Sequence, residues 1–190
     1  MKHAMIDIET LGTKPGCIVL TVGAARFDPL TGETSDHFYE AISFKNSVLQ
    51  GLFCDPNTHA WWQKQHEEAR KAAFAGEKSL SDVAKAFSSW SRDAAVEHWW
   101  CQGSDFDFPI WEEAMKAAKA SSPWKFWQKR DTRTLYAVAD FDAKNFPREG
   151  TYHNALDDSL HQIRCVHECY RRIGLVKSTT LTVIDDLEDL

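Results

Sequence analysis

The amino-acid sequence predicts an α/β protein in which one central sheet is flanked by helices. Three β-rich segments follow one another before residue 45, and helical and strand-like patterns then alternate toward the end of the chain. The length of 190 residues allows one sizeable core and is short for two full domains. We therefore expect a single domain over residues 1–175 and an acidic tail over residues 176–190.

The first three strands are expected to form an antiparallel meander. Residues 3–8 and 17–29 are apolar and β-branched, and the turn-forming letters TKPG separate them. The turn PLTGE then leads into TSDHFYEAISF (34–44), where apolar and polar residues alternate as in a strand. Consecutive strands joined by such short turns pair antiparallel.

Helical and strand-like patterns alternate in the rest of the chain. We expect helices over THAWWQKQHEEARKAAFA (58–75), from Ser79 to Trp90, from Phe108 to Ala118, over 132–140 and over 155–173. AVEHWWC (95–101) predicts a buried strand, and WKFWQKRDT (124–132) predicts a fifth strand or extended segment. NFPREGTYHNA, before the last helix, is typical of a loop.

The composition indicates an ordinary globular protein. Hydrophobic residues make up 43% and charged residues 26% of the chain. No apolar run approaches the ~18 to 20 residues of a membrane span, and the start lacks the layout of a signal peptide, so we expect a cytoplasmic protein without a membrane partner. Five scattered cysteines without a C-x2-C pair suggest neither disulfides nor a zinc site.

The net charge of −6 is only a weak objection to a nucleic-acid partner. Half of it comes from the segment after Gly174, where one lysine faces four acids. If four of the remaining acids bind metal ions, the rest of the domain carries a charge of about +1.

Two carboxylates lie inside the first apolar run, AMIDIETLG (4–12). Side chains alternate along a strand, so Asp7 and Glu9 share one face while Ile6 and Ile8 occupy the other. Adjacent buried acids repel each other and resist loss of water, unless a positive charge lies between them. The simplest candidate is a divalent metal ion.

The last helix offers a further acid in HNALDD (153–158). At ~100° per residue, Asp157 falls on the polar face, beside His161, and Asp158 falls beside small and weakly polar residues that could face protein. We therefore expect Asp158 to be buried and Asp157 to be exposed. His153 lies just before this helix, near enough to serve the same site.

A third acidic segment is QGSDFDFPIW (102–111). Asp105 and Asp107 both lie between a predicted strand and a helix start, where an acid can simply cap the helix. Spacing alone does not separate the two.

Taken in order, MIDIETLG, QGSDFD and HNALDD resemble the three motifs of the DEDDh family of 3′-5′ exonucleases. The likeness spans residues 7–158 and is greatest to the phage or prophage branch. It implies a ribonuclease H-like fold, with a mixed central sheet in which parallel strands join the three-strand antiparallel meander. Where many members carry Asn in the second motif, this chain has Gln102.

The resemblance also implies the roles of individual residues. It selects Asp107, which directly follows an aromatic residue, over Asp105. The general base implied is His153, whose ordinary pKa of ~6.5 leaves it neutral at pH 7. Two Mg²⁺ or Mn²⁺ ions would be bound by the four acids Asp7, Glu9, Asp107 and Asp158.

The reaction implied is removal of nucleoside 5′-monophosphates from a free 3′ end of single-stranded or frayed DNA or RNA. A homodimer is possible, because several relatives pair. Two alternatives stay open: a catalytically inactive nucleic-acid-binding module on the same fold, and a ribonuclease H-like endonuclease, which shares the acids but needs no histidine in this loop.

Candidate substrate contacts follow from the same likeness and from residue chemistry. The residues after the first acids, Thr10 and Leu11, and the aromatic Phe106 are candidates for base and sugar contacts. Trp61 or Trp62 could stack on a base, but adjacent helix positions point ~100° apart, so we expect one of them in the core. Arg133 could hold a phosphate, although a helix cap at Asp131 or Thr132 explains that segment more simply.

Overall fold

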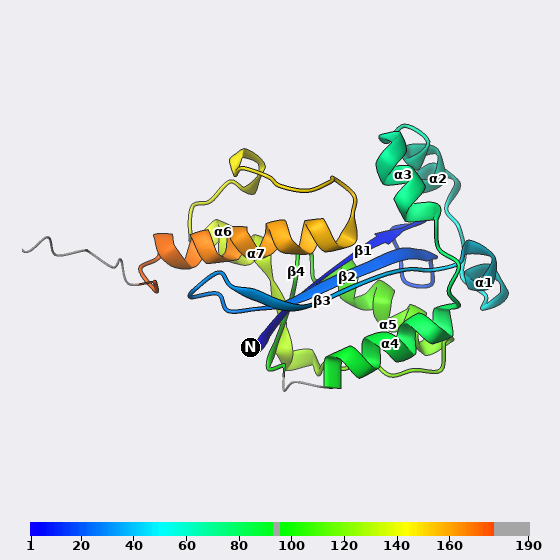
Figure 1. Cartoon of the computed structure of the whole chain (residues 1–190), viewed down its shortest axis with the longest axis horizontal. Coiled ribbons are helices and arrows are strands. Elements are labelled where there is room, and N and C mark those ends of the chain that lie inside the picture. The colour runs from blue at the N-terminus through cyan, green and yellow to red at the C-terminus, as the bar shows by residue number, and fades with distance from the viewer. Residues whose placement is uncertain (93–95, 177–190) are drawn as a thin grey trace, which may run out of the picture.

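The computed structural model describes residues 1–92 and 96–176, in which five strands form one mixed sheet in the order β3-β2-β1-β4-β5 (Figure 1). β1 pairs antiparallel with β2 and parallel with β4, β2 pairs antiparallel with β3, and β4 pairs parallel with β5. The predicted meander and α/β class are therefore confirmed. The strands are β1 (His3–Thr10), β2 (Val19–Phe27), β3 (Thr34–Ala41), β4 (His98–Cys101) and β5 (Lys129–Asp131).

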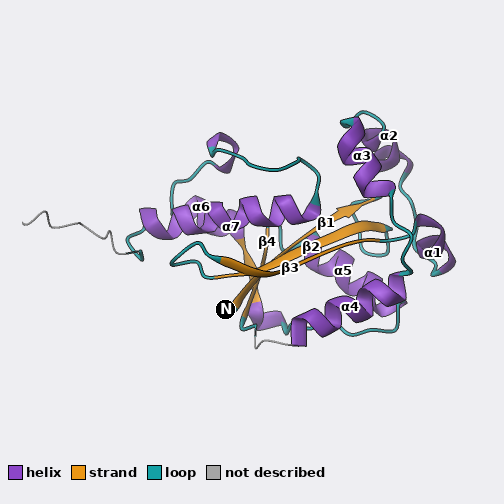
Figure 2. Cartoon of the chain, viewed as in Figure 1, coloured by secondary structure: helices purple, strands orange, loops and turns teal. Residues whose placement is uncertain are grey.

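Helices cover both faces of the sheet and one of its ends (Figures 1 and 2). On one face lie α6 (Thr132–Val138) and α7 (Ala155–Arg172), and on the other lie α4 (Leu80–Arg92) and α5 (Asp107–Ala117). α1 (Phe44–Leu49), α2 (Pro56–Trp62) and α3 (Glu67–Phe74) gather near the end at which β1 stops. Among the described helices, none is long and apolar enough to cross a membrane.

Each face of the sheet has its own apolar core. The larger core contains Ile6 and Ile8 of β1 with residues of α4 and α5 such as Phe87 and Trp111. A smaller core under α7 contains Met5, Phe27, Trp100, Ile163 and Val166. β1 thus sends alternate side chains into two different environments, as the strand geometry requires.

Gly23 on β2 lets α7 lie directly on the sheet. Gly23 pairs with Asp7 across the β1–β2 ladder. A Cβ atom at Gly23 would lie 2.2 Å from the backbone carbon of Ala155, the first residue of α7, so only glycine allows this approach. The Ser159 hydroxyl donates to the Gly23 carbonyl oxygen at 3.2 Å. The start of α7 is therefore held beside Asp7.

Three local predictions need correction. Residues 58–75 form two helices rather than one, and Gln63–His66 separate them; the Trp62 indole at the end of the first donates to the Thr10 carbonyl oxygen at 2.9 Å. The sequence analysis missed α1, whose cap is Ser43. In the expected fifth strand, Phe126–Gln128 form a 3-10 turn and only Lys129–Asp131 pair with β4.

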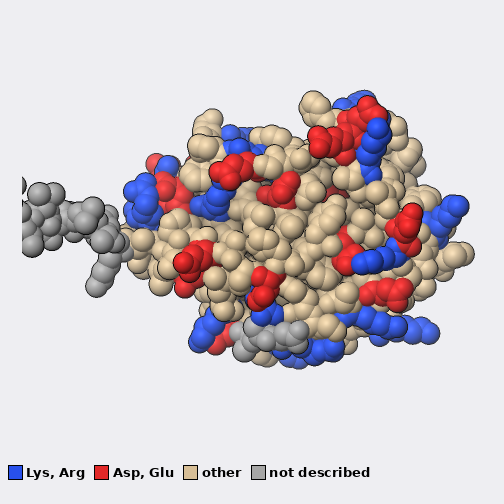
Figure 3. All heavy atoms as spheres, in the orientation of Figure 1, with Lys and Arg blue, Asp and Glu red and all other residues tan. Residues whose placement is uncertain are grey.

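Other expectations concern the cysteines, the charge and the tail. The five cysteines, all among the described residues, are free thiols, and four are buried. Acidic and basic side chains are interspersed over the face of the molecule in Figure 3. The acidic segment 177–190 lies outside the described residues, so the boundary expected at residue 175 stays a prediction.

Candidate active site

Carboxylates from three distant segments of the chain meet in one cleft of about 380 Å³, named here the acidic cleft. They come from the end of β1, the start of α5 and the first turn of α7. The charged residues predicted for the site all line this cleft: Asp7, Glu9, Asp107, His153 and Asp158.

The strand alternation expected for β1 is present. Ile6 and Ile8 point into the larger core, with 0% and 4% of their surface exposed. Asp7 and Glu9 point to the α7 side, where the Gln162 side chain donates to Asp7 Oδ1 at 2.7 Å. The sequence analysis did not assign Gln162, although it lies one helical turn after Asp158 and so shares its face.

The structure distinguishes the two acids of segment 102–111, Asp105 and Asp107. Asp107 begins α5 and is buried, and its Oδ1 accepts the backbone N–H of Ile8 at 3.3 Å. Asp105 is exposed. Asp107 is therefore tied to the strand that carries the first two acids.

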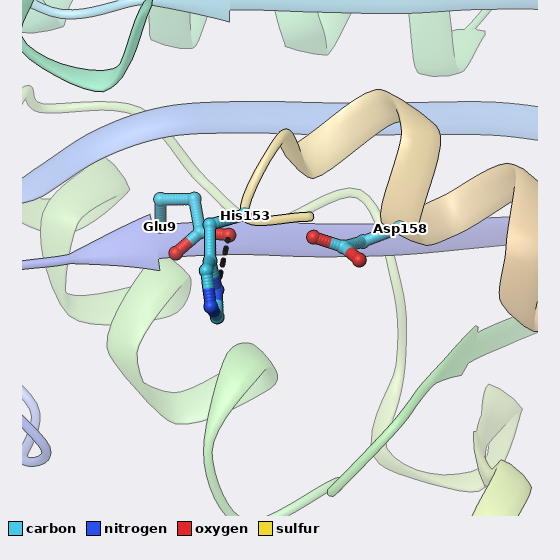
Figure 4. Close-up of side chains that lie close together, drawn as sticks. All are labelled: Glu9, His153 and Asp158. Carbon is cyan, nitrogen blue, oxygen red and sulfur yellow. Dashed lines mark ion pairs between the residues drawn. The ribbon is translucent and has the colours of Figure 1, made fainter. Parts of the chain in front are cut away.

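Local structure at the start of α7 positions His153 and Asp158. Asn154 caps the helix, because its side chain accepts the N–H groups of Leu156 and Asp157 at 3.1 and 3.2 Å. His153 has a φ of 61°, in the left-handed region that is unfavourable for most residues with a side chain. This turn directs the imidazole back over the end of β1 (Figure 4).

The prediction that Asp157 is exposed on a polar helix face is wrong. The Asp157 side chain is half-buried. Its Oδ2 accepts the N–H of Thr151 at 2.7 Å, so this carboxylate holds the preceding loop. His161 on the same side is only 8% exposed, because the α6–α7 connection covers it and brings the Phe146 ring near. A helical wheel does not include such a covering loop.

Burial and mutual repulsion make the acids reluctant to ionise. The pKa values of Asp7 and Glu9 are raised well above the ordinary range, first by burial and then by neighbouring carboxylates. Burial also raises the pKa of Asp107 to about 7, and it raises that of Asp158 against the effect of Arg148. A cation placed among these oxygens would lower all four values.

Arg148 is a cation that the structure pairs directly with one of these acids. Its guanidinium forms an ion pair with Asp158, and both side chains are largely buried. Arg148 is not predicted by any sequence pattern, because it lies in an irregular loop without periodicity. The signal that could have identified Arg148 is its basic side chain in the loop just before His153, the predicted general base.

His153 is placed to interact with both the acids and an aromatic wall. Its Nδ1 lies 3.8 Å from Glu9 Oε1, and the Asp158 carboxylate points toward Glu9 (Figure 4). Glu9, His153 and Asp158 each offer a ligand atom within 4.8 Å of the other two. Burial lowers the pKa of His153, so the free imidazole is neutral at pH 7 and can accept a proton.

A second cavity of about 400 Å³, the aromatic pocket, adjoins the acidic cleft. Its walls include Thr10, Trp61, Trp62 and Phe106, and it shares Ile8, Glu9 and Phe106 with the acidic cleft. Trp61 is 42% exposed, and its ring centroid lies 5.0 Å from that of His153. The Trp62 side chain is fully buried, as expected for one member of the pair.

The structure places the other candidate contacts differently. The Leu11 side chain is fully buried in the larger core and lines neither the acidic cleft nor the aromatic pocket, and its predicted substrate contact stays a prediction. The Thr10 hydroxyl already donates to the Gly12 carbonyl oxygen at 2.6 Å. Asp131 caps α6 by accepting the Arg133 N–H at 2.8 Å, while Arg133 and Gln102 both line the acidic cleft.

Two solved structures share the ribonuclease H-like fold of this chain. Pop2p of S. pombe, in a form with Mg²⁺ and Mn²⁺ bound, is 16% identical with a TM-score of 0.60, over 90% of this chain and 83% of the other. The nuclease domain of 3′hExo, a DEDDh family member bound to rAMP, is 11% identical with a TM-score of 0.62, over 92% of this chain and 94% of the other.

Sequence comparisons agree with the motifs. An exodeoxyribonuclease of Enterobacteria phage T4 is 27% identical over 91% of this chain and 86% of its own length, in line with the expected likeness to phage enzymes. Residues 2–170 match the family described as the 3′-5′ exoribonuclease Rv2179c-like domain. The chain therefore belongs to this family and is a 3′-5′ exonuclease.

Proposed function

We propose that the acidic cleft hydrolyses the terminal phosphodiester bond of single-stranded or frayed DNA or RNA in a metal-dependent reaction, releasing nucleoside 5′-monophosphates. Asp7, Glu9, Asp107 and Asp158 hold Mg²⁺ or Mn²⁺, and His153 is the general base. The observation that carries this proposal is the convergence of these carboxylates from three distant segments in one cleft.

The donor set fits hard divalent ions. All four donors are carboxylates, which suit Mg²⁺ and Mn²⁺, and their pKa values stay raised although Arg148 pairs with one of them, so the nearby arginines do not balance the negative charge. Pop2p, which shares the fold, has been solved with both ions. When bound, two such ions supply an activated water and neutralise charge on the leaving oxygen.

His153 takes the proton from the attacking water. Its lowered pKa keeps the imidazole neutral, and the Trp61 ring and the Glu9 carboxylate restrict its orientation. The left-handed backbone at His153 is consistent with this role, because strained residues persist where the surrounding structure holds them for function.

The aromatic pocket receives the 3′-terminal nucleotide. It adjoins the acidic cleft through Glu9 and Phe106, so a base held there leaves its 5′-phosphate at the carboxylates. Half-exposed Trp61 offers a face for stacking, which tolerates any base. The 3′hExo domain, of similar fold, has been solved with rAMP.

The test is degradation of matched DNA and RNA strands with free or blocked 3′ ends, with Mg²⁺ and with chelator. We expect stepwise shortening from free 3′ ends only, its loss with chelator, and a loss of at least about 10³-fold for Asp7→Ala. The rates on the two strands identify the preferred sugar.

Segment 102–111 supplies a matched pair of variants. Asp107→Asn removes a buried carboxylate of the cleft, whereas Asp105→Asn removes an exposed one two residues away. Activity should fall only in the first. Cutting of 3′-blocked strands would identify an endonuclease instead, and binding without cleavage would identify an inactive module.

A further inference from the structure

Arg148 contacts three groups around the acidic cleft. Its guanidinium pairs with the Asp158 carboxylate, its Nη2 donates to the Thr151 carbonyl oxygen at 3.4 Å, and its Cζ lies 4.0 Å from the centroid of the Tyr152 ring. Its Nε–H is buried without a hydrogen-bond partner among the described residues. A buried guanidinium therefore keeps one donor free.

Behind Arg148 lies a cavity of about 240 Å³, the arginine pocket. Among the described residues that line it there is no carboxylate, and two, Lys144 and Arg148, are cationic. The others are Gln102, Ala143, Phe146, Tyr152 and His161. His161 is 8% exposed, and its Nδ1 has no partner among the described residues. The pocket thus combines positive charge with unpaired polar atoms, which suits an anion.

The acidic cleft borders both of the other cavities, through different residues. The aromatic pocket shares three residues with the acidic cleft, and the arginine pocket meets that cleft on a different side, through Gln102 and the Arg148–Asp158 pair. If the terminal base occupies the first cavity and the scissile phosphate the second, the retained strand continues toward the third. One nucleoside further along that strand lies its next charged group, a phosphate.

We propose that the arginine pocket is a subsite for the backbone phosphate one linkage upstream of the scissile bond, and that Arg148 is its principal contact. Without metal, Arg148 rests on Asp158. When a divalent ion neutralises Asp158, the guanidinium turns to the substrate phosphate. This inference rests on the proposed role of Asp158 as a metal ligand.

The chemistry of both partners favours this exchange. Arginine binds phosphate through two parallel hydrogen bonds, and such pairs are stronger than bonds between neutral groups. A metal ion and a guanidinium at the same carboxylate repel each other, so metal binding weakens the Arg148–Asp158 pair. The Tyr152 ring stays in contact with the side chain and limits its movement.

The decisive experiment combines Arg148→Gln with strands in which one linkage is an uncharged methylphosphonate. The quantity measured is KM for release of the first 3′ nucleotide. For the wild type, a methylphosphonate at the second linkage should raise KM about 10-fold, and Arg148→Gln on a normal strand should do the same. Together the two changes should still give about 10-fold, because they remove the same contact.

Two controls define the contact. A methylphosphonate at the fourth linkage should leave the difference between wild type and Arg148→Gln intact. Arg164→Gln removes an arginine that pairs with Glu149 of the same loop but lines neither the acidic cleft nor the arginine pocket, and its KM should stay within about 2-fold of wild type. Additive losses of about 100-fold would overturn the proposed contact.

A binding measurement separates this inference from the proposed function. Calorimetric titration of substrate-free protein with Mn²⁺ should show Kd about 5- to 10-fold lower for Arg148→Gln than for wild type, because a competing cation is gone. Arg148→Lys should bind Mn²⁺ with nearly the affinity of the wild type but show the same raised KM as Arg148→Gln. If Asp158→Asn leaves the Mn²⁺ affinity unchanged, the proposed metal site is overturned. If Asp158→Asn loses Mn²⁺ affinity but Arg148→Gln does not change it, only the exchange of Arg148 between Asp158 and phosphate is overturned.

Discussion

The two faces of β1 differ sharply although their residues alternate in one strand. Ile6 and Ile8 face α4 and α5 in the larger core and have almost no exposed surface. Asp7 and Glu9 face α7 and meet other carboxylates instead of apolar side chains. One face therefore supplies stability, while the other holds charges that repel each other.

The difference has a consequence for stability at different pH. Asp7, Glu9 and Asp107 have raised pKa values, so the folded chain binds more protons than the unfolded chain between the ordinary carboxyl pKa and the raised values. The metal-free protein is therefore most stabilised by these groups at acidic pH. That contribution is lost as the pH rises from about 4 through about 7, the pKa of Asp107.

The largest effect is expected when a charge is removed from the acidic face. Asp7→Asn should lower kcat/KM by at least about 10³-fold, because metal affinity and charge balance both depend on this carboxylate. At pH 7.5 without metal, urea denaturation should give this variant a free energy of unfolding about 1 to 3 kcal/mol higher than that of the wild type, because a buried charge that repels its neighbours is gone. A variant that is inactive and also less stable would contradict the proposed repulsion.

His153→Gln should lower kcat by about 10²-fold, the usual contribution of a general base. In the wild type, the rate should fall with decreasing pH only below about 6.5, because burial lowers the pKa of His153 and a protonated imidazole cannot accept a proton. The variant should lack this limb in a pH–rate profile. His37→Gln, at an exposed position on the edge strand β3, should behave as wild type.

The apolar face should respond in the opposite way. Ile6→Ala removes a fully buried side chain from the larger core, which should cost about 2 to 4 kcal/mol of unfolding free energy in urea denaturation. The activity of the folded fraction should remain within about 3-fold of wild type, because no group of the acidic cleft changes. A loss of activity comparable to that of Asp7→Asn would show that the two faces are not independent.

The smallest effect is expected at the edge of the cleft. Trp61→Ala should raise KM for single strands about 10-fold with little change in stability, because a stacking face is lost from a half-exposed position. Trp127→Ala is the matched control, since this exposed tryptophan lines neither the acidic cleft nor the aromatic pocket. Equal changes in both variants would argue against stacking in the aromatic pocket.

Local sequence determined most of the secondary structure and the acids of the site. Alternation in β1 separated Ile6 and Ile8 from Asp7 and Glu9, and the helical period placed Asp158 toward protein. The two faces of β1 and the side of α7 that carries Asp158 both depend on neighbours within a few residues, so periodicity is enough to predict them. Asp107 was different: its choice over Asp105 came from the family resemblance, and burial later agreed.

Only the tertiary structure decided which residues surround those acids. The examples are the hydrogen bond between Trp62 and Thr10, the complete burial of Leu11, the loop over His161 and the Arg148–Asp158 pair, which all join distant segments through packing. Such contacts depend on where irregular loops pass over the finished sheet. No periodic pattern encodes that path, because a loop has no repeating geometry that relates its residues to a particular face.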